Sequence, residues 1–474
     1  MSLICKNMVI NFTNLPKTLD KIIEAGWLLI FGLSPIFFCP WVYGTWQIGE
    51  YFLFQVLTEI ILFVWLAKII FESRTNAANS QRESVLSQRK SVMFRILPAI
   101  IFIVILGLAT IFSKSPYHSF WGYYQRKMGY IIWLHFFAFF SILFFNLKDK
   151  KQIIRIFYAI IGSSVVVVVY GFLQIFGLDP FPWSESPFFN SRIFSTLGQP
   201  NFLASWLLLI IPIIFWALFK VARHWTSKNN FFNRIFKRPL IACLLFGTII
   251  SLVLTQSRSG WIGFFIAFFF FIIIWAYFKK QKRLSLLLLI LLAVIILFVI
   301  YLNFNPIAPQ KGDSFLIARL KTLTNFNETG KLRLIWWGNS LDLIKQAPIF
   351  GYGPEIQRFL FIPYYQPDFA VLEAINSYPD RAHNDILDTL LIGGILGLIS
   401  YLFLIISAFC LGLKSVFKSK LEILVLLTGL IGYLVSIQFS FHVIPTAVYF
   451  WGYLAIVLKI SLLPEEANND YANQ

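Results

Sequence analysis

Arginines stand in several of the polar stretches that separate the apolar segments of this sequence. Arg258 lies in the break Thr255-Gln256-Ser257-Arg258-Ser259-Gly260, and Arg126 lies at the start of an apolar segment. An arginine held at the edge of a membrane needs an anionic partner. Each of these side chains is therefore either a clamp for the phosphates of a ligand or a group that reaches the lipid headgroups.

Arg192 precedes the turn Gly198-Gln199-Pro200-Asn201, in which glycine and proline define the backbone. The side-chain amides of Gln199 and Asn201 are candidates for ligand binding at the membrane boundary. The alternative is an ordinary helix start at which Asn201 serves as the cap.

A stretch that begins at Arg333 has the spacing of an amphipathic helix, which would lie on the membrane surface or cover a cavity. Arg333 either binds a ligand or stacks on Trp337. The turn Gly351-Tyr352-Gly353 further on would let backbone amides face a ligand. The apolar residues that recur at helical spacing are Leu334, Trp337, Leu341 and Ile344.

His383 stands before a late apolar segment, in Ala382-His383-Asn384-Asp385. We expect it on the first turn of a helix, where the dipole favours a neutral imidazole that serves as a general base. Asp385 and Asp388 act in the opposite sense, so the direction of the pKa stays open. The alternative is a histidine that only orders the helix terminus. The rival histidines are His118, His135 and His442.

Several familiar kinds of catalytic site are missing from the sequence. It contains no Asp-x-Asp pair, no metal-ligand spacing of His, Cys, Asp or Glu, no phosphate-binding loop and no nucleotide fingerprint. These absences argue against a metal-dependent, sugar-nucleotide enzyme, and we predict neither a metal site nor a cofactor. Outward arginines with one histidine fit another chemistry, the displacement of a lipid diphosphate from a sugar.

The elements that must position these residues are membrane-spanning helices. Of the 474 residues, 58% are hydrophobic and 13% are charged, whereas a soluble protein has about 25% charged residues. We expect an all-α, polytopic integral membrane protein with about twelve transmembrane helices, since a span needs about 20 apolar residues. The apolar runs are 22–41, 51–71, 96–112, 128–145, 156–176, 202–219, 240–254, 261–278, 284–302, 386–413, 421–437 and 443–463.

One long polar segment interrupts these spans and divides the chain into four parts. Residues 1–303 hold spans one to nine, residues 304–383 form a large external loop, residues 384–463 hold the last three spans, and residues 464–474 form a tail. The loop is too long for an idle connector and is rich in aromatic residues, so we expect it to be ordered and functional. Glu59, in the second span, should face the bundle interior as a proton relay or as half of a buried pair.

Lys and Arg residues gather in alternate loops, which indicates cytoplasmic termini and an external large loop. The net charge of +18 then faces anionic membrane lipids. No nucleic-acid partner is needed to explain it.

Four groups of residues, taken in order along the chain, resemble the bacterial O-antigen ligase and polymerase superfamily, which includes protein O-oligosaccharyltransferases. Trp121, Gly122, Arg126 and Gly129 are similar to a further part of that family. The resemblance covers roughly residues 110–410. The four groups are Arg192 with Gly198-Gln199-Pro200-Asn201, Ser257-Arg258-Ser259-Gly260, Arg333 with Pro348 and Gly351-Tyr352-Gly353, and His383-Asn384 with Gly394 and Gly397.

The resemblance implies a GT-C-like fold and an inverting, metal-independent glycosyltransferase of the bacterial inner membrane. Such an enzyme takes a glycan from undecaprenyl diphosphate on the periplasmic face and passes it to a hydroxyl of a glycan, lipid or protein acceptor. The resemblance implies His383 as the base and Arg258 and Arg333 as diphosphate ligands. The further substrate-binding candidates are Arg192 and Arg126 for the diphosphate, and Asn384, Gln199 and Asn201.

The chain departs from the family at one position. Many members carry an acidic residue before the glycine that follows the His-Asn motif, whereas this chain has Leu391-Ile392-Gly393-Gly394 there. A role that rests on that acid therefore does not carry over.

A membrane transporter or flippase of the same superfamily is the alternative function, because transporters bind substrates near the midplane at broken helices. Polar residues gathered near the outer surface favour the enzyme, whereas a midplane site favours transport. A structural scaffold in an envelope-assembly complex is a third hypothesis, and it predicts no pocket under the long loop. The sequence does not separate ligase, polymerase and protein-glycosylating activities, which share a donor.

Overall fold

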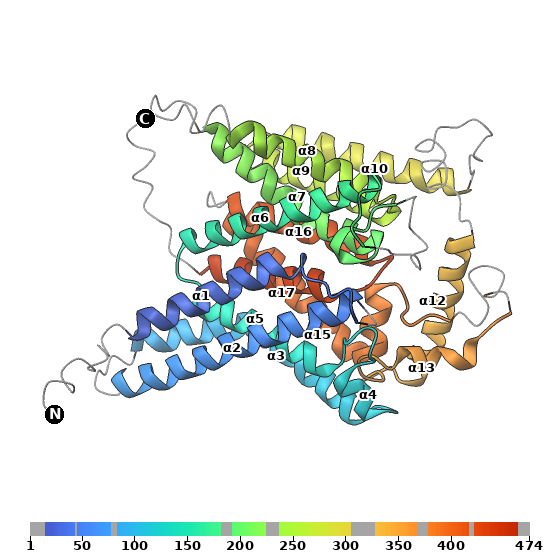
Figure 1. The fold of residues 1–474 in the computed structure, drawn as a ribbon, viewed down its shortest axis with the longest axis horizontal. Coiled ribbons are helices and arrows are strands. Elements are labelled where there is room, and N and C mark those ends of the chain that lie inside the picture. The colour runs from blue at the N-terminus through green and yellow to red at the C-terminus, as the bar shows by residue number, and fades with distance from the viewer. Residues whose placement is uncertain are drawn as a thin grey trace, which may run out of the picture.

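The computed structural model consists of helices joined by turns, with no strand among the residues that it describes. These residues are 15–42, 45–76, 83–181, 192–223, 237–304, 328–367, 369, 378–416 and 421–462. The predicted all-α class is confirmed for them, and each predicted apolar run contains a helix (Figure 1). The first run was predicted too long, because α1 ends at Leu33 and the chain turns over residues 34–42. The helices are α1 (Leu15–Leu33), α2 (Thr45–Asn76), α3 (Glu83–Ile111), α5 (Tyr130–Asn146), α6 (Lys150–Ile175), α7 (Pro200–Arg223), α8 (Arg238–Leu254), α9 (Arg258–Phe278), α10 (Lys282–Phe304), α15 (Asp385–Val416), α16 (Leu421–Ile437) and α17 (Ile444–Ile460).

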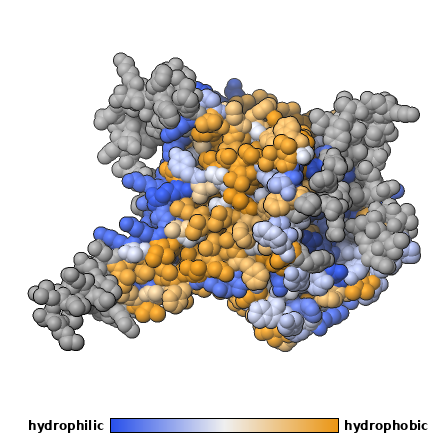
Figure 2. All heavy atoms as spheres, viewed as in Figure 1, coloured by the Kyte–Doolittle hydropathy of each residue, from blue (hydrophilic) through white to orange (hydrophobic). Residues whose placement is uncertain are grey.

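The surface of this bundle is apolar over most of its length. Within the described residues, six helices are long and apolar enough to cross a membrane: α2, α3, α6, α7, α9 and α15. Shorter apolar helices, α5, α8, α16 and α17, accompany them. Figure 2 shows a broad hydrophobic band over the visible face, with hydrophilic side chains toward both ends. These are the features of a polytopic membrane protein, and the number of twelve spans stays a prediction.

Helix α17 is the centre of the bundle. Every residue of α17 except Lys459 is buried, and the helix packs against α5, α15 and α16. The Tyr453 hydroxyl donates to the carbonyl of Leu209 in α7 at 3.3 Å, which satisfies a buried polar group inside the core. Helices α7 and α9 pack on α16, and α3 packs on α15. The starts of α15 and α17 are therefore held firmly by neighbours from both halves of the chain.

The large loop contributes helix α12 (Glu328–Gln346) and the short helix α13 (Gln357–Phe361), which lie with α4 (Pro116–Trp121) at one end of the molecule in Figure 1. The predicted amphipathic helix is present, but its predicted apolar face is only half right. Trp337 and Ile344 are partly buried against neighbours, whereas Leu334 and Leu341 are exposed. The buried side chains are instead Leu332, Trp336 and Leu343. The reason is that α12 packs against α15, and this contact selects a different stripe of the helix.

Helix α15 is interrupted at Gly394, whose φ of 62° lies in the left-handed region. The N–H groups of Tyr352 and Gly353 donate to carbonyls of α15 at 2.7 and 3.1 Å, and Ile395 N–H donates in return to Pro348 O at 2.8 Å. A Cβ on Gly394 would lie 2.2 Å from the loop backbone, so only glycine fits. The prediction that the amides of this turn face a ligand is wrong, because they anchor the loop to α15.

Glu59 does not face the bundle interior, which corrects the expectation from sequence. Its side chain is 53% exposed, accepts a hydrogen bond from Gln55 Nε2 at 2.8 Å and lies 3.1 Å from His135 Nε2. The side of α2 that packs inward is instead occupied by Thr58 and Ile61. A central proton relay through Glu59 is therefore excluded.

Candidate active site

His383 lies before α15 rather than on its first turn, where sequence had placed it, because the helix begins at Asp385. Its φ of 54° is left-handed, a conformation that costs energy for a residue with a side chain. The imidazole centroid lies 5.0 Å from the ring of Trp336 on α12 and 5.1 Å from the ring of Phe441 before α17. The turn thus presents the imidazole between elements from distant parts of the chain.

The hydrogen bond of His383 assigns its tautomer. Nδ1 lies 3.1 Å from the carbonyl oxygen of Arg381, and a carbonyl only accepts, so Nδ1 of the neutral ring carries the proton and Nε2 carries the lone pair. Burial lowers the pKa of His383; the charge of Asp380 opposes this shift, and the charges of Arg333 and Arg126 add to it. The ring is therefore neutral near pH 7 and can accept a proton at Nε2.

Arg126 is paired with Asp380. Its Nε donates to Asp380 Oδ2 at 2.7 Å, and its guanidinium lies 4.9 Å from the centroid of Phe441. Burial would raise the pKa of Asp380, but the charges of Arg126 and His383 outweigh it and lower that pKa to about 2. Arg126 thus reaches the cluster around His383, and the Nε edge of its guanidinium is already hydrogen-bonded to the Asp380 carboxylate.

Arg258 and Arg333 interact electrostatically with each other. Arg258 is the first residue of α9, where Ser257 Oγ caps the helix by accepting the Gly260 N–H at 3.3 Å. Burial lowers the pKa of Arg333 to about 10, and the neighbouring charge of Arg258 acts in the same direction. Both side chains stay charged at neutral pH. Two like charges held together near a helix N-terminus form a site that favours an anion.

Arg192 lies beside the same break in the helices. Its Nε donates to the carbonyl of Thr255 at 2.8 Å, three residues before Arg258. Gln199 and Asn201 flank the start of α7 and are partly buried. The neighbouring Phe202 packs on Phe441 at 5.5 Å, which joins this turn to the cluster through an aromatic contact.

The side chain of Asn384 holds the start of α15. Its Oδ1 accepts the Leu387 N–H at 3.0 Å, and its Nδ2 donates to the carbonyl of Gln438 at 3.1 Å. Asn384 is therefore a helix cap that ties the His383 turn to the segment after α16. Trp337 also holds this turn, since its Nε1 donates to Ala382 O at 3.1 Å.

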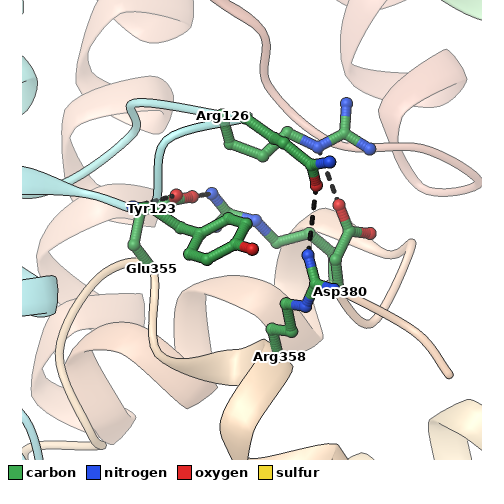
Figure 3. A pocket seen from close by; sticks show the side chains of 7 residues that line it. Tyr123, Arg126, Glu355, Arg358 and Asp380 are labelled. Carbon is green, nitrogen blue, oxygen red and sulfur yellow. Dashed lines mark hydrogen bonds and ion pairs between the residues drawn. The ribbon is translucent and has the colours of Figure 1, made fainter. Parts of the chain in front are cut away.

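A small pocket opens beside Arg126 (Figure 3). Its walls carry four groups that the sequence analysis missed. Glu355 lies before α13 and Arg358 lies on it, and Asp380 and Arg381 come shortly before His383. Arg381 Nη2 donates to Glu355 Oε1. The sequence did hold one signal, the Asp-Arg pair directly before the Ala-His-Asn motif. The other lining residues are Tyr123, Gln125 and Arg126.

Two buried donors on α12 have no hydrogen-bond partner among the described residues. Trp336 Nε1 belongs to a side chain that is 7% exposed and packs on His383, and Asn339 Nδ2, one turn further, belongs to a side chain that is 8% exposed. An unsatisfied buried donor costs about 1–3 kcal/mol. Oxygen atoms of a bound ligand would offset that cost.

Residues 241–402 match the family model of the O-antigen ligase. The resemblance to the O-antigen ligase superfamily is confirmed. The matched segment contains Arg258, Arg333 and His383, and it begins after Arg126 and Arg192. No curated protein matches the chain. The match indicates a glycosyltransferase-like membrane enzyme that acts on a lipid-linked glycan and an acceptor.

A second polar network lies beside the His383 turn. His442 Nδ1 lies 2.7 Å from the Tyr433 hydroxyl, and His442 Nε2 lies 3.1 Å from Asp385 Oδ1. The Tyr401 hydroxyl donates to Asp385 Oδ2 at 2.9 Å and lies 3.1 Å from His442 Nε2. These groups join α15, α16 and the start of α17. The network fixes Phe441, whose ring touches both His383 and Arg126.

The cluster as a whole offers positive charge, one neutral imidazole and two unsatisfied donors in the middle of α12. Within the part of the chain that the structure describes, no three His, Cys, Asp or Glu side chains are grouped so as to hold a metal ion. An anion held by Arg258 and Arg333 would lie next to His383, because Arg333 interacts electrostatically with both neighbours.

Proposed function

We propose that the protein transfers or polymerises a glycan from undecaprenyl diphosphate onto an acceptor hydroxyl. The observation that carries this proposal is the continuity of the cluster from Arg258 through Arg333 to His383. Three sequence motifs of the O-antigen ligase domain supply these three residues, and their side chains come from three different elements. A diphosphate and a general base are the two requirements of glycan transfer from such a donor.

Arg258 and Arg333 bind the diphosphate in this proposal, with Arg192 beside them. The leaving diphosphate gains negative charge as the glycosidic bond breaks, and guanidinium groups that are already in place stabilise that charge. The loss of one such donor costs about a hundred- to a thousandfold in rate. The arginines supply the positive charge that a metal ion supplies in other glycosyltransferases, so the reaction proceeds without a metal.

His383 is the general base. The acceptor oxygen attacks the anomeric carbon as its proton passes to Nε2 of His383, and the bond from that carbon to the diphosphate oxygen breaks. The polyprenyl diphosphate leaves as an anion and needs no general acid, and the imidazolium then returns its proton to water. Attack opposite to the leaving group inverts the anomeric configuration. A positioned base of this kind contributes about 10² to 10⁴ in rate.

We place the protein in the bacterial inner membrane with cytoplasmic termini and the site on the periplasmic face, in a GT-C-like fold. The distribution of Lys and Arg over the loops supports this orientation. Ion pairs at the opposite helix ends, such as Lys68 with Asp20 at 2.8 Å and Lys150 with Glu422 at 3.0 Å, agree with it. The position of the cluster at helix ends, rather than midway along them, favours the enzyme over a transporter.

The test is the transfer of a labelled glycan from undecaprenyl diphosphate by the purified protein in lipid nanodiscs with EDTA present. We expect product in the wild type, with the anomeric configuration inverted. Retained configuration or a requirement for added metal would contradict the mechanism. The absence of transfer, together with movement of the lipid between leaflets, would support a flippase instead.

A further inference from the structure

The pocket beside Arg126 contains three arginines and two carboxylates, and one arginine differs from the others (Figure 3). Arg126 is paired with Asp380, and Arg381 is paired with Glu355. Arg358 has no carboxylate partner among the described residues. Its guanidinium instead donates to neutral oxygens, from Nη1 to Gln125 Oε1 at 3.1 Å and from Nε to the Tyr378 hydroxyl at 3.3 Å.

Two aromatic rings hold this guanidinium in place. Its Cζ lies 4.7 Å from the centroid of Tyr123 and 5.4 Å from that of Tyr378. Stacking on two rings fixes the plane of the guanidinium, and the two hydrogen bonds leave further N–H groups on the pocket side. Among the described residues no carboxylate lies within ion-pair distance of Arg358, although the charge of Asp380 acts on it from further away. A planar fork in this state binds carboxylate or phosphate oxygens well. Tyrosine rings and the Gln125 amide are also groups that line saccharide sites.

His383 connects the pocket with the helix that carries Arg333. Its imidazole packs on Trp336 of α12, one turn after Arg333, at 5.0 Å. It also packs on Phe441 at 5.1 Å, and the guanidinium of Arg126, which lines the pocket, lies 4.9 Å from the centroid of the same ring. An inverting displacement needs the acceptor and the leaving group on opposite faces of the anomeric carbon. The side of His383 away from the diphosphate is the side where an acceptor must enter.

We propose that this pocket receives the anionic group of the acceptor saccharide, a carboxylate or a phosphate, and that Arg358 binds an oxygen of that group. The identification of the bound saccharide as the acceptor rests on the proposed function. The affinity for an anionic saccharide rests on the pocket alone. Arg126 and Asp380 then form the wall between the two substrates. This assigns Arg126 to the acceptor side, although the sequence motif suggested a diphosphate ligand.

Equilibrium binding to the purified protein in nanodiscs tests the subsite without the donor lipid. Inorganic pyrophosphate is added first to occupy Arg258 and Arg333, and the probes are glucose, glucuronic acid and glucose 6-phosphate. We expect at least one acidic probe to bind about ten- to a hundredfold more tightly than glucose, from hydrogen bonds to a charged group. The acidic probe with the higher affinity identifies the anion as a carboxylate or a phosphate. Equal binding of all three probes would overturn the proposal.

Matched variants identify the residue that causes the preference for acidic probes over glucose. Arg358→Gln should abolish it, and Arg358→Lys should reduce it, because a point charge replaces the fork. Lys345→Gln should keep it, because this change removes only an exposed charge on α12 that pairs with Asp342. A preference that survives Arg358→Gln, or that disappears in Lys345→Gln, would overturn the proposal. The melting temperature of each variant shows that it is folded.

The transfer reaction separates this inference from the proposed function. With an acidic acceptor, Arg358→Gln should raise the KM for the acceptor by about tenfold or more and leave the KM for the lipid donor unchanged. A rise in the donor KM alone would contradict an acceptor role. If the wild type transfers no glycan and the binding preference still depends on Arg358, the proposed function fails and the anionic saccharide site stands.

Discussion

His383 and His442 both lie next to Phe441, yet the protein holds them in opposite ways. His442 is buried with both ring nitrogens within hydrogen-bond distance of partners, Tyr433 on one side and Asp385 with Tyr401 on the other. Among the described residues His383 has a hydrogen-bond partner only at Nδ1, a backbone carbonyl, and its turn is left-handed, which costs energy.

The difference separates two uses of the same side chain. A buried polar network in which every member is bonded fixes the helices that carry it. A histidine that keeps one nitrogen unbonded, in a strained turn among arginines, is prepared for chemistry instead. We therefore expect His442 to contribute to stability and His383 to contribute to the reaction. Each experiment below tests one of these two roles.

His383→Gln should give the largest loss of activity. Glutamine keeps a similar size but cannot accept a proton, so the rate of glycan transfer should fall about 10²- to 10⁴-fold, measured with a saturating lipid donor. His118→Gln is the matched control, because the hydrogen-bond partner of His118 among the described residues is Ser115 in its own turn, and its ring packs on Phe359 rather than on the arginine cluster. Equal activity of the two variants would remove His383 from the mechanism.

His442→Leu should act on stability. It removes one hydrogen-bond partner from Asp385 and one from the Tyr433 hydroxyl, which keep Tyr401 and Thr446 as partners, at a cost of about 1–3 kcal/mol in the free energy of unfolding. Thermal unfolding in detergent measures the change, and His383→Gln serves as the comparison that should melt near the wild type. A variant His442→Leu that melts with the wild type would show that the network contributes nothing to stability.

Arg258→Lys and Arg333→Lys should each lower the rate of transfer about a hundred- to a thousandfold, because an ammonium group replaces a bidentate fork. Arg155→Lys is the control, since Arg155 pairs with Glu24 at the opposite helix ends. Isothermal titration with inorganic pyrophosphate should show the same ranking in affinity. Retained affinity in both cluster variants would argue that the diphosphate binds elsewhere.

The pH dependence of transfer gives the smallest effect and the most specific one. The neutral form of His383 is the active form and its pKa is lowered, so activity should fall with acidification only below the ordinary value of about 6.5. Arg333→Gln removes a positive neighbour and should move that acid limb to higher pH, whatever its effect on the rate. An unchanged limb would mean that another group titrates. Lys345→Gln should leave it in place.

The helices and the order of the motifs could be predicted from sequence, because apolar runs of sufficient length have only one stable form in a membrane. The face of α12 could not, because it depends on contact with α15 rather than on the pattern Leu334, Trp337, Leu341. No sequence motif pointed to Arg358 or Glu355. Arg358 matters through its contact with Tyr123 and Glu355 through its ion pair with Arg381, and both partners belong to other segments of the chain. Glu59 was misplaced because hydropathy gives the depth of a residue along a span but not the side that it faces.

A structure of the protein with undecaprenyl diphosphate bound tests the central claim most directly. We expect the diphosphate oxygens within hydrogen-bond distance of the Arg258 and Arg333 guanidinium groups, with the glycosidic oxygen on the side of His383 Nε2. A diphosphate that contacts Arg358 and Arg126 instead, or that binds away from His383, would contradict the account.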